Sequence, residues 1–322
     1  MTAPLPDGTH PTVHSLFRYP GGKSWFTPFL LRYLDAHPTG LFVEPFAGGA
    51  SLSAAVLTHT RADVWLNELD EDVAAVHEVT FGDQAPALAR RILDFDLTLD
   101  AAQAVLNSDP RSTLDRAFRT ILKNRVNRGG ILAPRAGLVR LGENGRGLKQ
   151  RWYAQTLADR IGALHAARHR VRVTRLDALT LLEQTPFPSG AALFIDPPYT
   201  AGHKSAGRRL YRHHQLDHAR LFRACAALTA PWLMTHEHDE TVMALAWTHH
   251  LPWRTVTMTS GHNVTARELV VAPDFAWAQH LPDLRDAPTP TAPSLYGPLF
   301  RMHPPHASPG ASAAPLPDTG RG

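Results

Sequence analysis

The stretch Leu193-Phe194-Ile195-Asp196-Pro197-Pro198-Tyr199 decides the fold. Its three apolar residues are typical of the end of a buried strand. The acid stands where that strand stops, because neither of the two prolines can donate a hydrogen bond to a neighbouring strand. In an open α/β sheet, ligands bind at the carboxyl ends of the strands. We therefore expect Asp196 and Tyr199 to lie at a binding crevice.

The same stretch indicates what kind of ligand the crevice accepts. It offers the Asp196 carboxylate, the Pro197 carbonyl and the Tyr199 ring within four residues. Two acceptors and a stacking surface suit a planar amine. A strand followed by a proline-rich turn with no function has the same sequence pattern, so other segments have to decide between the two interpretations.

Composition sets outer limits. The chain has 322 residues, 43% of them hydrophobic, which suffices for one large domain or two modest ones. No apolar run approaches 18 residues, and the N-terminus lacks the features of a signal peptide. Its one cysteine, Cys225, stands in an apolar helical pattern and is expected to be a core thiol. These features predict a cytoplasmic protein, and a net charge of +4 permits nucleic-acid binding without requiring it.

The N-terminal part begins with residues 1–13, which are expected to form a flexible arm. The following Gly22-Lys23-Ser24 resembles a phosphate-binding loop, but that loop needs a glycine where Phe17 stands. A nucleoside-triphosphate site is therefore rejected. Lys23 opens a predicted helix with aromatic and leucine side chains on one face.

Two strands follow, each with polar residues at its end. Residues 40–44 are predicted to form a buried strand, followed by a turn over 45–51 and a helix. A strand, a glycine turn and a helix N-terminus form a general small-ligand cradle. The next strand, 63–68, ends in Glu68, at the offset where an acid commonly bonds ribose hydroxyls. Asp70 is expected to cap the helix that follows.

The pattern changes between residues 85 and 169, where the sequence predicts helices and no strand. The middle of this region is rich in arginine and glycine, and two aromatics, Trp152 and Tyr153, follow it. A basic, flexible segment beside aromatics is typical of a surface that binds a phosphate backbone, although a solvated loop has the same composition. The predicted DNA-contact residues are Arg125, Asn127, Arg128, Arg135, Arg140, Arg146 and Lys149.

Strand and helix then alternate again up to a predicted hairpin formed by residues 255–258 and 268–271. From residue 281, proline, alanine, serine and glycine predict a disordered tail, 281–322. The histidine pairs near residues 213 and 236 lack the spacing of known zinc motifs, so no metal site is expected.

Four motifs in this order resemble the D12 class, or Dam-like, DNA adenine-N6 methyltransferases. They are Tyr19-Pro-Gly-Gly-Lys23, Glu44-Pro-Phe-Ala-Gly-Gly49, Asn67-Glu68-Leu69-Asp70 and Asp196-Pro-Pro-Tyr199. The resemblance implies an α/β fold with the Rossmann-like seven-stranded sheet of S-adenosylmethionine (SAM)-dependent methyltransferases and a reversed last hairpin. It places the catalytic domain in residues 14–84 and 170–280, and a helical target-recognition domain in 85–169.

The resemblance also implies roles for single residues. Asp196, Pro197 and Tyr199 would hold the target adenine, with the Asp196 carboxylate and Pro197 carbonyl accepting from its N6 amine. Asp177 would read the adenine of SAM, and Glu68 its ribose. The full cofactor set is Tyr19, Lys23, Phe46, Gly48, Gly49, Glu68, Asp177 and Asp196.

The implied function is methyl transfer from SAM to N6 of a flipped-out adenine in double-stranded DNA. We expect a monomer in the cytoplasm of a bacterium or of a phage-infected cell, near the nucleoid, and no membrane partner. A cognate restriction endonuclease is a candidate partner. Two alternatives stay open: an RNA adenine-N6 methyltransferase, which uses the same kind of crevice, and a non-catalytic DNA-binding relic.

Overall fold

The computed structural model describes residues 14–18, 22–132, 137–139, 147–199, 216–259, 265–279, 281 and 284–286. All elements described below belong to one compact unit, residues 1–287. Predicted features at Tyr19 and in most of the C-terminal tail lie outside the described residues.

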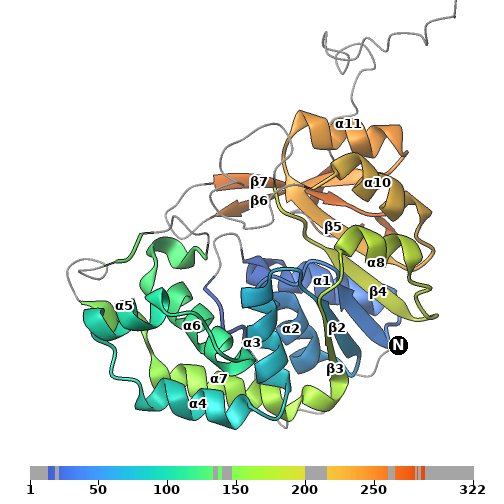
Figure 1. Ribbon diagram of the computed structural model, residues 1–322. Helices are drawn as coiled ribbons and strands as arrows, with labels where there is room; N and C mark the ends of the chain where they lie inside the picture. The colour runs from blue at the N-terminus through green and yellow to red at the C-terminus, as the bar shows by residue number, and fades with distance from the viewer. Residues whose placement is uncertain are drawn as a thin grey trace, which may run out of the picture. The chain divides into compact units, whose positions relative to one another are not determined.

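A mixed sheet forms the centre of this unit (Figure 1). Its strand order is β3-β2-β1-β4-β5-β7-β6-β8. Strands β1 to β5 run parallel, whereas β7 pairs antiparallel with both β5 and β6. Strands β1 to β7 confirm the predicted seven-stranded sheet with a reversed last hairpin, and β8 adds an eighth strand at the edge. The strands are β1 Leu41–Glu44, β2 Asp63–Asn67, β3 Val171–Thr174, β4 Ala191–Ile195, β5 Trp232–Glu237, β6 Trp253–Thr259, β7 Thr265–Val271 and β8 Leu284–Asp286.

Strand β8 is a correction to the predicted domain boundary. It pairs antiparallel with β6 through Arg254↔Asp286, Thr255↔Arg285 and Val256↔Leu284, inside the region that was expected to be tail. Three residues are too few to show a period of two, and the prolines around them hide the strand. The sheet therefore extends to Asp286, six residues beyond the predicted boundary.

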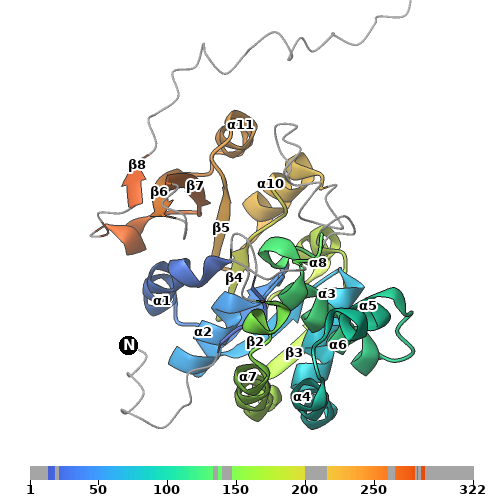
Figure 2. The ribbon, with the colours of Figure 1, turned by 90° about the vertical axis from the view of Figure 1, so that its left-hand side faces the viewer.

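Alternate residues of each strand pack against opposite helical layers. On β4, Phe194 lies in the core with α1 and α2, while Leu193 and Ile195 pack with α8, α10 and α11. The near-continuous apolar run of this strand reflects burial on both faces. Figure 2 shows α1 and α2 on one side of β4, with α8 and α10 on the other. The helices are η1 Lys23–Phe26, α1 Thr27–Ala36, α2 Ser51–His59, α3 Glu71–Phe81, α8 Ala178–Gln184, α10 His218–Ala227 and α11 Glu240–Thr248.

Between β2 and β3 the described chain forms helices, with an isolated β-bridge between Asn127 and Leu138. Apolar residues of α3, α4, α6 and α7 form one core with Leu16 and Phe17 of the N-terminal segment. Helices α4 and α7 lie side by side at the bottom of both ribbon views (Figures 1 and 2). The elements are α4 Ala85–Asp94, α5 Leu99–Asn107, α6 Thr113–Val126, η2 Arg128–Gly130, η4 Leu148–Arg151, α7 Ala154–Ala166 and η5 Arg168–Arg170.

Two further expectations concern single features. Cys225 is buried on α10, and burial raises its thiol pKa, as expected of a core thiol. Among the described residues, every helix is too short or too polar to cross a membrane.

Candidate active site

Asn67, at the end of β2, ties three strand ends together. Its Nδ2 donates to the Pro45 and Leu176 carbonyls, each at 3.0 Å, and its Oδ1 accepts from Leu176 N–H and the Thr174 hydroxyl, each at 2.8 Å. Both amide hydrogens and both acceptor positions of this buried side chain are therefore used. The carboxyl ends of β1, β2 and β3 are fixed relative to one another.

The glycine turn after β1 is held from two sides at Gly48. Its N–H donates to Glu68 Oε2 at 2.7 Å, and its carbonyl lies 2.8 Å from His77 Nε2. Gly48 has a φ of +48°, a region that favours glycine. Burial lowers the pKa of His77 to about 4, so the ring is neutral at pH 7 and donates through Nε2.

The Glu68 carboxylate bridges this turn and the next helix. Its Oε1 accepts from the Asp70 N–H at 2.8 Å. Asp70 in turn caps α3, because its side chain accepts from Asp72 N–H, which confirms the predicted cap. Burial raises the pKa of Glu68 to about 7, although the two backbone N–H groups oppose the shift. The binding of ribose by Glu68 stays a prediction.

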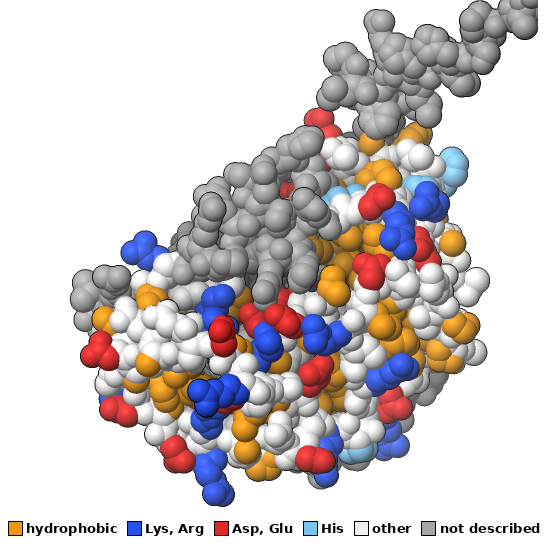
Figure 3. All heavy atoms as spheres, viewed as in Figure 1, with side chains coloured by type: hydrophobic (Ala, Val, Ile, Leu, Met, Phe, Trp, Pro, Cys, Tyr) orange, Lys and Arg blue, Asp and Glu red, His pale blue; other side chains and the backbone are white. Residues whose placement is uncertain are grey.

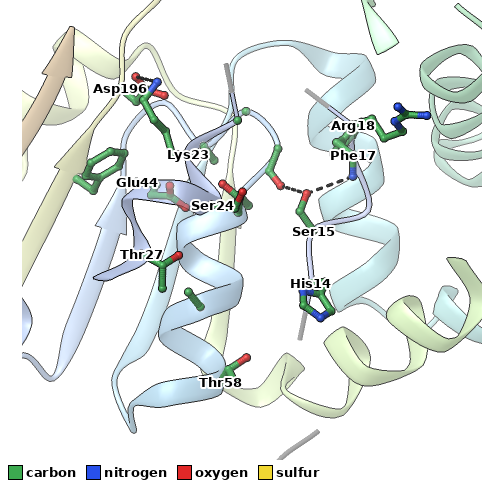
Figure 4. A pocket seen from close by; sticks show the side chains of 18 of the residues that line it. His14, Ser15, Phe17, Arg18, Lys23, Ser24, Thr27, Glu44, Thr58 and Asp196 are labelled. Atoms are coloured by element: carbon green, nitrogen blue, oxygen red, sulfur yellow. Dashed lines mark hydrogen bonds and ion pairs between the residues drawn. The ribbon is translucent and has the colours of Figure 1, made fainter. Parts of the chain in front are cut away.

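A cavity of about 800 Å³ opens at this edge of the sheet. Figure 4 shows Lys23 and Asp196 at one end of it and His14 and Ser15 further along. A fully extended nucleoside fits a cavity of this size. Five predicted site residues line it together: Lys23, Phe46, Gly48, Gly49 and Asp196.

Asp196 is the centre of a polar cluster at the end of β4. Its Oδ1 accepts from the Tyr199 hydroxyl at 3.0 Å and from the Thr235 hydroxyl at 2.9 Å, and lies 3.1 Å from Lys23 Nζ. Lys23 Nζ also lies 3.6 Å from Oε2 of Glu268, a buried residue of β7. We call Lys23, Asp196, Tyr199 and Glu268 the carboxylate cluster.

The Tyr199 ring is already stacked on one face. Its centroid lies 5.0 Å from that of His236, at an interplanar angle of 23°. His236 is buried on β5, and burial lowers its pKa to about 3, so its ring is neutral. His236 therefore supports the Tyr199 ring from one side, and Lys23 Nζ lies 4.9 Å from the centroid of the same ring.

Two buried glutamates carry raised pKa values. Burial raises the pKa of Glu268 to about 7, with Lys23 opposing and the Asp196 charge reinforcing the shift. Burial raises the pKa of Glu44 to about 8, against the hydrogen bonds from the Ser53 hydroxyl and N–H. Glu44 is thus protonated at pH 7, whereas Glu268 is close to its midpoint.

The remaining predicted cofactor residues stand apart from this cavity or outside the described part. Asp177 is exposed and caps α8, accepting from the N–H and hydroxyl of Thr180. It follows β3, the neighbour of β2. Its contact with the adenine of SAM stays a prediction. Tyr19 lies outside the described residues. Within the described part, no group of three or more potential metal ligands lies together.

Two predicted DNA contacts are corrected by the structure. Arg125 is 5% exposed and donates through Nη2 to the Leu16 carbonyl at 2.7 Å. Asn127 is 2% exposed and donates to the Ile131 carbonyl at 2.7 Å. A phosphate cannot reach side chains buried in this way. Together with Asn124, which bonds both the N–H and carbonyl of Arg18, Arg125 fastens the N-terminal segment to α6.

Other members of the basic set remain on the surface. Arg128 is exposed at the end of α6, and exposed Lys149 pairs with Asp96 at 2.6 Å. On the face shown in Figure 3, basic and acidic side chains are interspersed rather than gathered in one patch. Arg135, Arg140 and Arg146 lie outside the described residues.

Glu268, Thr235 and His236 were not among the predicted site residues. Thr235 and His236 lie on the parallel strand β5 and contact Asp196 and Tyr199, whereas Glu268 lies on the reversed strand β7 and contacts Tyr199. The signal was present for Glu268, an acid that precedes the buried run Leu269-Val270-Val271. Antiparallel pairing of β5 and β7 brings it to the end of β5, beside the end of β4.

A comparison with protein families gives a match for the N-terminal part of the chain, which contributes the glycine turn to the site. Residues 19–94 match the family model of the D12 class N6 adenine-specific DNA methyltransferases. The resemblance inferred from the sequence motifs is confirmed over this stretch, which carries the glycine turn, Asn67 and Glu68. The match supports methyltransferase activity and implies SAM as the methyl donor. No curated protein sequence matches the chain.

Solved structures give only distant likenesses. A protein described as the methyltransferase yhhF of Escherichia coli has 14% identity and a TM-score of 0.35, over 82% of this chain and 90% of its own. A protein of Pyrococcus horikoshii described as an RNA methyltransferase has 11% identity and a TM-score of 0.35, over 80% and 84%. We draw no functional conclusion from likenesses this remote; the fold follows from the strand order above.

Proposed function

We propose that this protein transfers a methyl group from SAM to the N6 amine of an adenine in DNA. The observation that carries the proposal is the position of Asp196. It ends β4 at the cavity that the matched segment also lines, with Gly48 and Gly49 on the cofactor side. One edge of the sheet thus holds a nucleoside-sized space and a carboxylate for an amine.

The residues of the cavity fit SAM. Gly48 lacks a side chain at the turn, and a Cβ placed there would meet no atom within 4 Å, so the space above it is open. Glu68 is not among the residues that line the cavity, but its Oε2 accepts from the N–H of Gly48, which does line it, so the carboxylate lies next to the place proposed for the ribose. The cofactor, when bound, supplies an electrophilic methyl group on a sulfonium.

The chain's own residues then act on the adenine. The N6 lone pair of adenine is delocalised into the ring, so the amine is a poor nucleophile. Hydrogen bonds from N6–H to Asp196 and the Pro197 carbonyl would localise that pair and aim it in line with the methyl group. Because a stacked adenine cannot reach the end of β4, the base has to leave the duplex. The Tyr199 ring would stack on the base in place of its lost neighbours, at about 1–3 kcal/mol per stacked base.

Transfer of labelled methyl from SAM to unmethylated genomic DNA tests the proposal. We expect label in N6-methyladenine of DNA and none in matched RNA. The Asp196→Ala variant should bind SAM in calorimetry and lose transfer. Label in RNA alone would establish the RNA methyltransferase, and absence of SAM binding by the wild type would establish the non-catalytic relic.

A further inference from the structure

Methylation of an amine leaves a proton to be removed, and the structure holds a second carboxylate beside Asp196. The Tyr199 hydroxyl lies 3.0 Å from Asp196 Oδ1 and 3.5 Å from Glu268 Oε2. It is therefore placed between the two carboxylates, with hydrogen-bond distances on both sides. Hydrogen bonds of this kind are often long before substrate binds.

We propose that Glu268 is the terminal proton acceptor of the reaction, reached from Asp196 through the hydroxyl of Tyr199. This inference rests on the proposed function and assigns a role to a residue that no sequence motif contains.

The transfer balances in three moves. As the new N–C bond forms, the N6 proton passes to the Asp196 carboxylate. Asp196 then gives a proton to the Tyr199 oxygen while the Tyr199 hydroxyl gives its own proton to Glu268. Asp196 is again a carboxylate, Tyr199 is neutral and Glu268 is protonated. Glu268 returns its proton to solvent before the next turnover.

The surroundings of Glu268 suit this task. Lys23 Nζ lies 3.1 Å from Asp196 and 3.6 Å from Glu268, so one ammonium faces two carboxylates. Two carboxylates that share one ammonium repel each other, and this repulsion favours the uptake of a proton by one of them. The raised pKa of Glu268, about 7, agrees with that charge balance. The other titratable neighbours are His236, which is neutral, and Glu237, the cross-strand partner of Glu268.

The other buried glutamate at the cavity does not fit. Glu44 Oε2 accepts from the Ser53 hydroxyl and N–H, so this oxygen is held by the first turn of α2. The Tyr199 hydroxyl, which contacts Asp196, lies within hydrogen-bond distance of Glu268 Oε2 instead. Among the described residues that touch Asp196 or its partners, Glu268 is the carboxylate placed to accept the proton that the reaction releases.

Single-turnover methyl transfer to DNA, followed between pH 5.5 and 9, tests the relay. We expect the wild-type rate to rise through about pH 7. Glu268→Gln should slow transfer about 100-fold and abolish that rise, with the dissociation constant of SAM within twofold of wild type. Tyr199→Phe keeps the ring but lacks the hydroxyl, and it should also slow transfer about 100-fold and abolish the rise with pH. The double variant should be no slower than either single variant, because both remove the same relay. Glu183→Gln, an exposed carboxylate on α8 paired with Arg220, is the matched control and should match wild type.

Several results would overturn the relay. Glu268→Gln with the wild-type rate and pH profile would do so, as would additive losses in the double variant. If Glu268→Gln does not fold, the wild type in D2O decides, because the absence of a solvent isotope effect on transfer contradicts a proton relay. No transfer of label to DNA by the wild type overturns the proposed function itself, and the relay with it.

Discussion

The ammonium of Lys23 lies 3.1 Å from the carboxylate of Asp196, and the first residue of η1 is thereby joined to the end of β4. The two residues are 173 positions apart in sequence and belong to separate motifs of the sequence analysis. Lys23 was predicted to contact SAM. The structure gives it a partner in the proposed base site as well, so it links the cofactor cavity to the site of transfer.

Removing this ammonium should destabilise the protein. Lys23→Met leaves the carboxylates of Asp196 and Glu268 without a cation, and breaking a buried pair by removing one partner costs about 3–5 kcal/mol. Lys149→Met is the control, because its pair with Asp96 is exposed and should change stability by less than about 1 kcal/mol. Urea denaturation of both variants measures the difference; equal stabilities would show that the buried pair contributes nothing.

The contact of His77 with Gly48 should matter for cofactor binding. His77→Phe removes the donor to the Gly48 carbonyl and should weaken SAM binding about 2- to 10-fold, the net value of one hydrogen bond. His77→Gln restores an N–H donor and should recover most of that loss in calorimetry. If His77→Gln folds normally but binds SAM as weakly as His77→Phe, His77 has a packing role only.

His77 also predicts a pH effect on stability. Its pKa falls from 6.5 to about 4 on folding, so the native state binds fewer protons than the unfolded state in that range. The contribution of His77 is therefore lost as pH falls from 6.5 through about 4. The difference in unfolding free energy between wild type and His77→Gln should change in this window and stay flat above pH 7.

Gly130 should not tolerate a side chain. A Cβ at this position would lie 2.2 Å from the Arg18 carbonyl, and its φ of +74° disfavours other residues. Gly130→Ala should therefore lower stability by about 2 kcal/mol or more, through both strain and displacement of the N-terminal segment. Gly137→Ala is the matched control, since a Cβ there meets nothing within 4 Å. Thermal unfolding of the two variants should separate them clearly.

The two arginines at the end of α6 should behave differently towards DNA. Arg128→Ala removes an exposed charge and should lower the slope of log affinity against log salt by about 0.9, if that side chain contacts one phosphate. Arg125→Ala should instead lower stability, because Arg125 is buried and bonds the Leu16 carbonyl. Filter binding at several salt concentrations, beside thermal unfolding, checks both. An unchanged slope for Arg128→Ala would remove it from the DNA surface.

The parallel half of the fold was predictable because its signals are local. Strands β1, β2, β4 and β5 contain short apolar runs and β3 alternates, and polar residues such as Glu44, Glu68 and Asp196 stand at or just after the strand ends. The family resemblance named Lys23, Phe46, Gly48 and Asp196 as site residues, and all four line one cavity. Glu268 was missed because its position depends on the reversal of β7, which brings it from 72 residues away in sequence.

The error at Arg125 has a different cause. A count of charges treats every arginine of a basic segment as solvated, whereas Arg125 falls on the buried face of α6. The spacing Phe118, Ile121, Leu122 and Arg125 is i, i+3, i+4 and i+7, which is one face of a helix. Residues 14–18 cover that face of α6. The sequence of α6 alone does not indicate which distant segment packs on it.

The hydrogen bonds of Asn67 lower the entropic cost of ligand binding. Because one side chain locks the ends of three strands, the floor of the cavity is preorganised in the free protein. The conformational entropy of ordering these loops is lost when the chain folds and is not lost again when a ligand arrives. Hydrogen exchange at Glu68 and Leu176 should consequently be slow with or without ligand, and the motions that accompany binding should be confined to segments outside this frame.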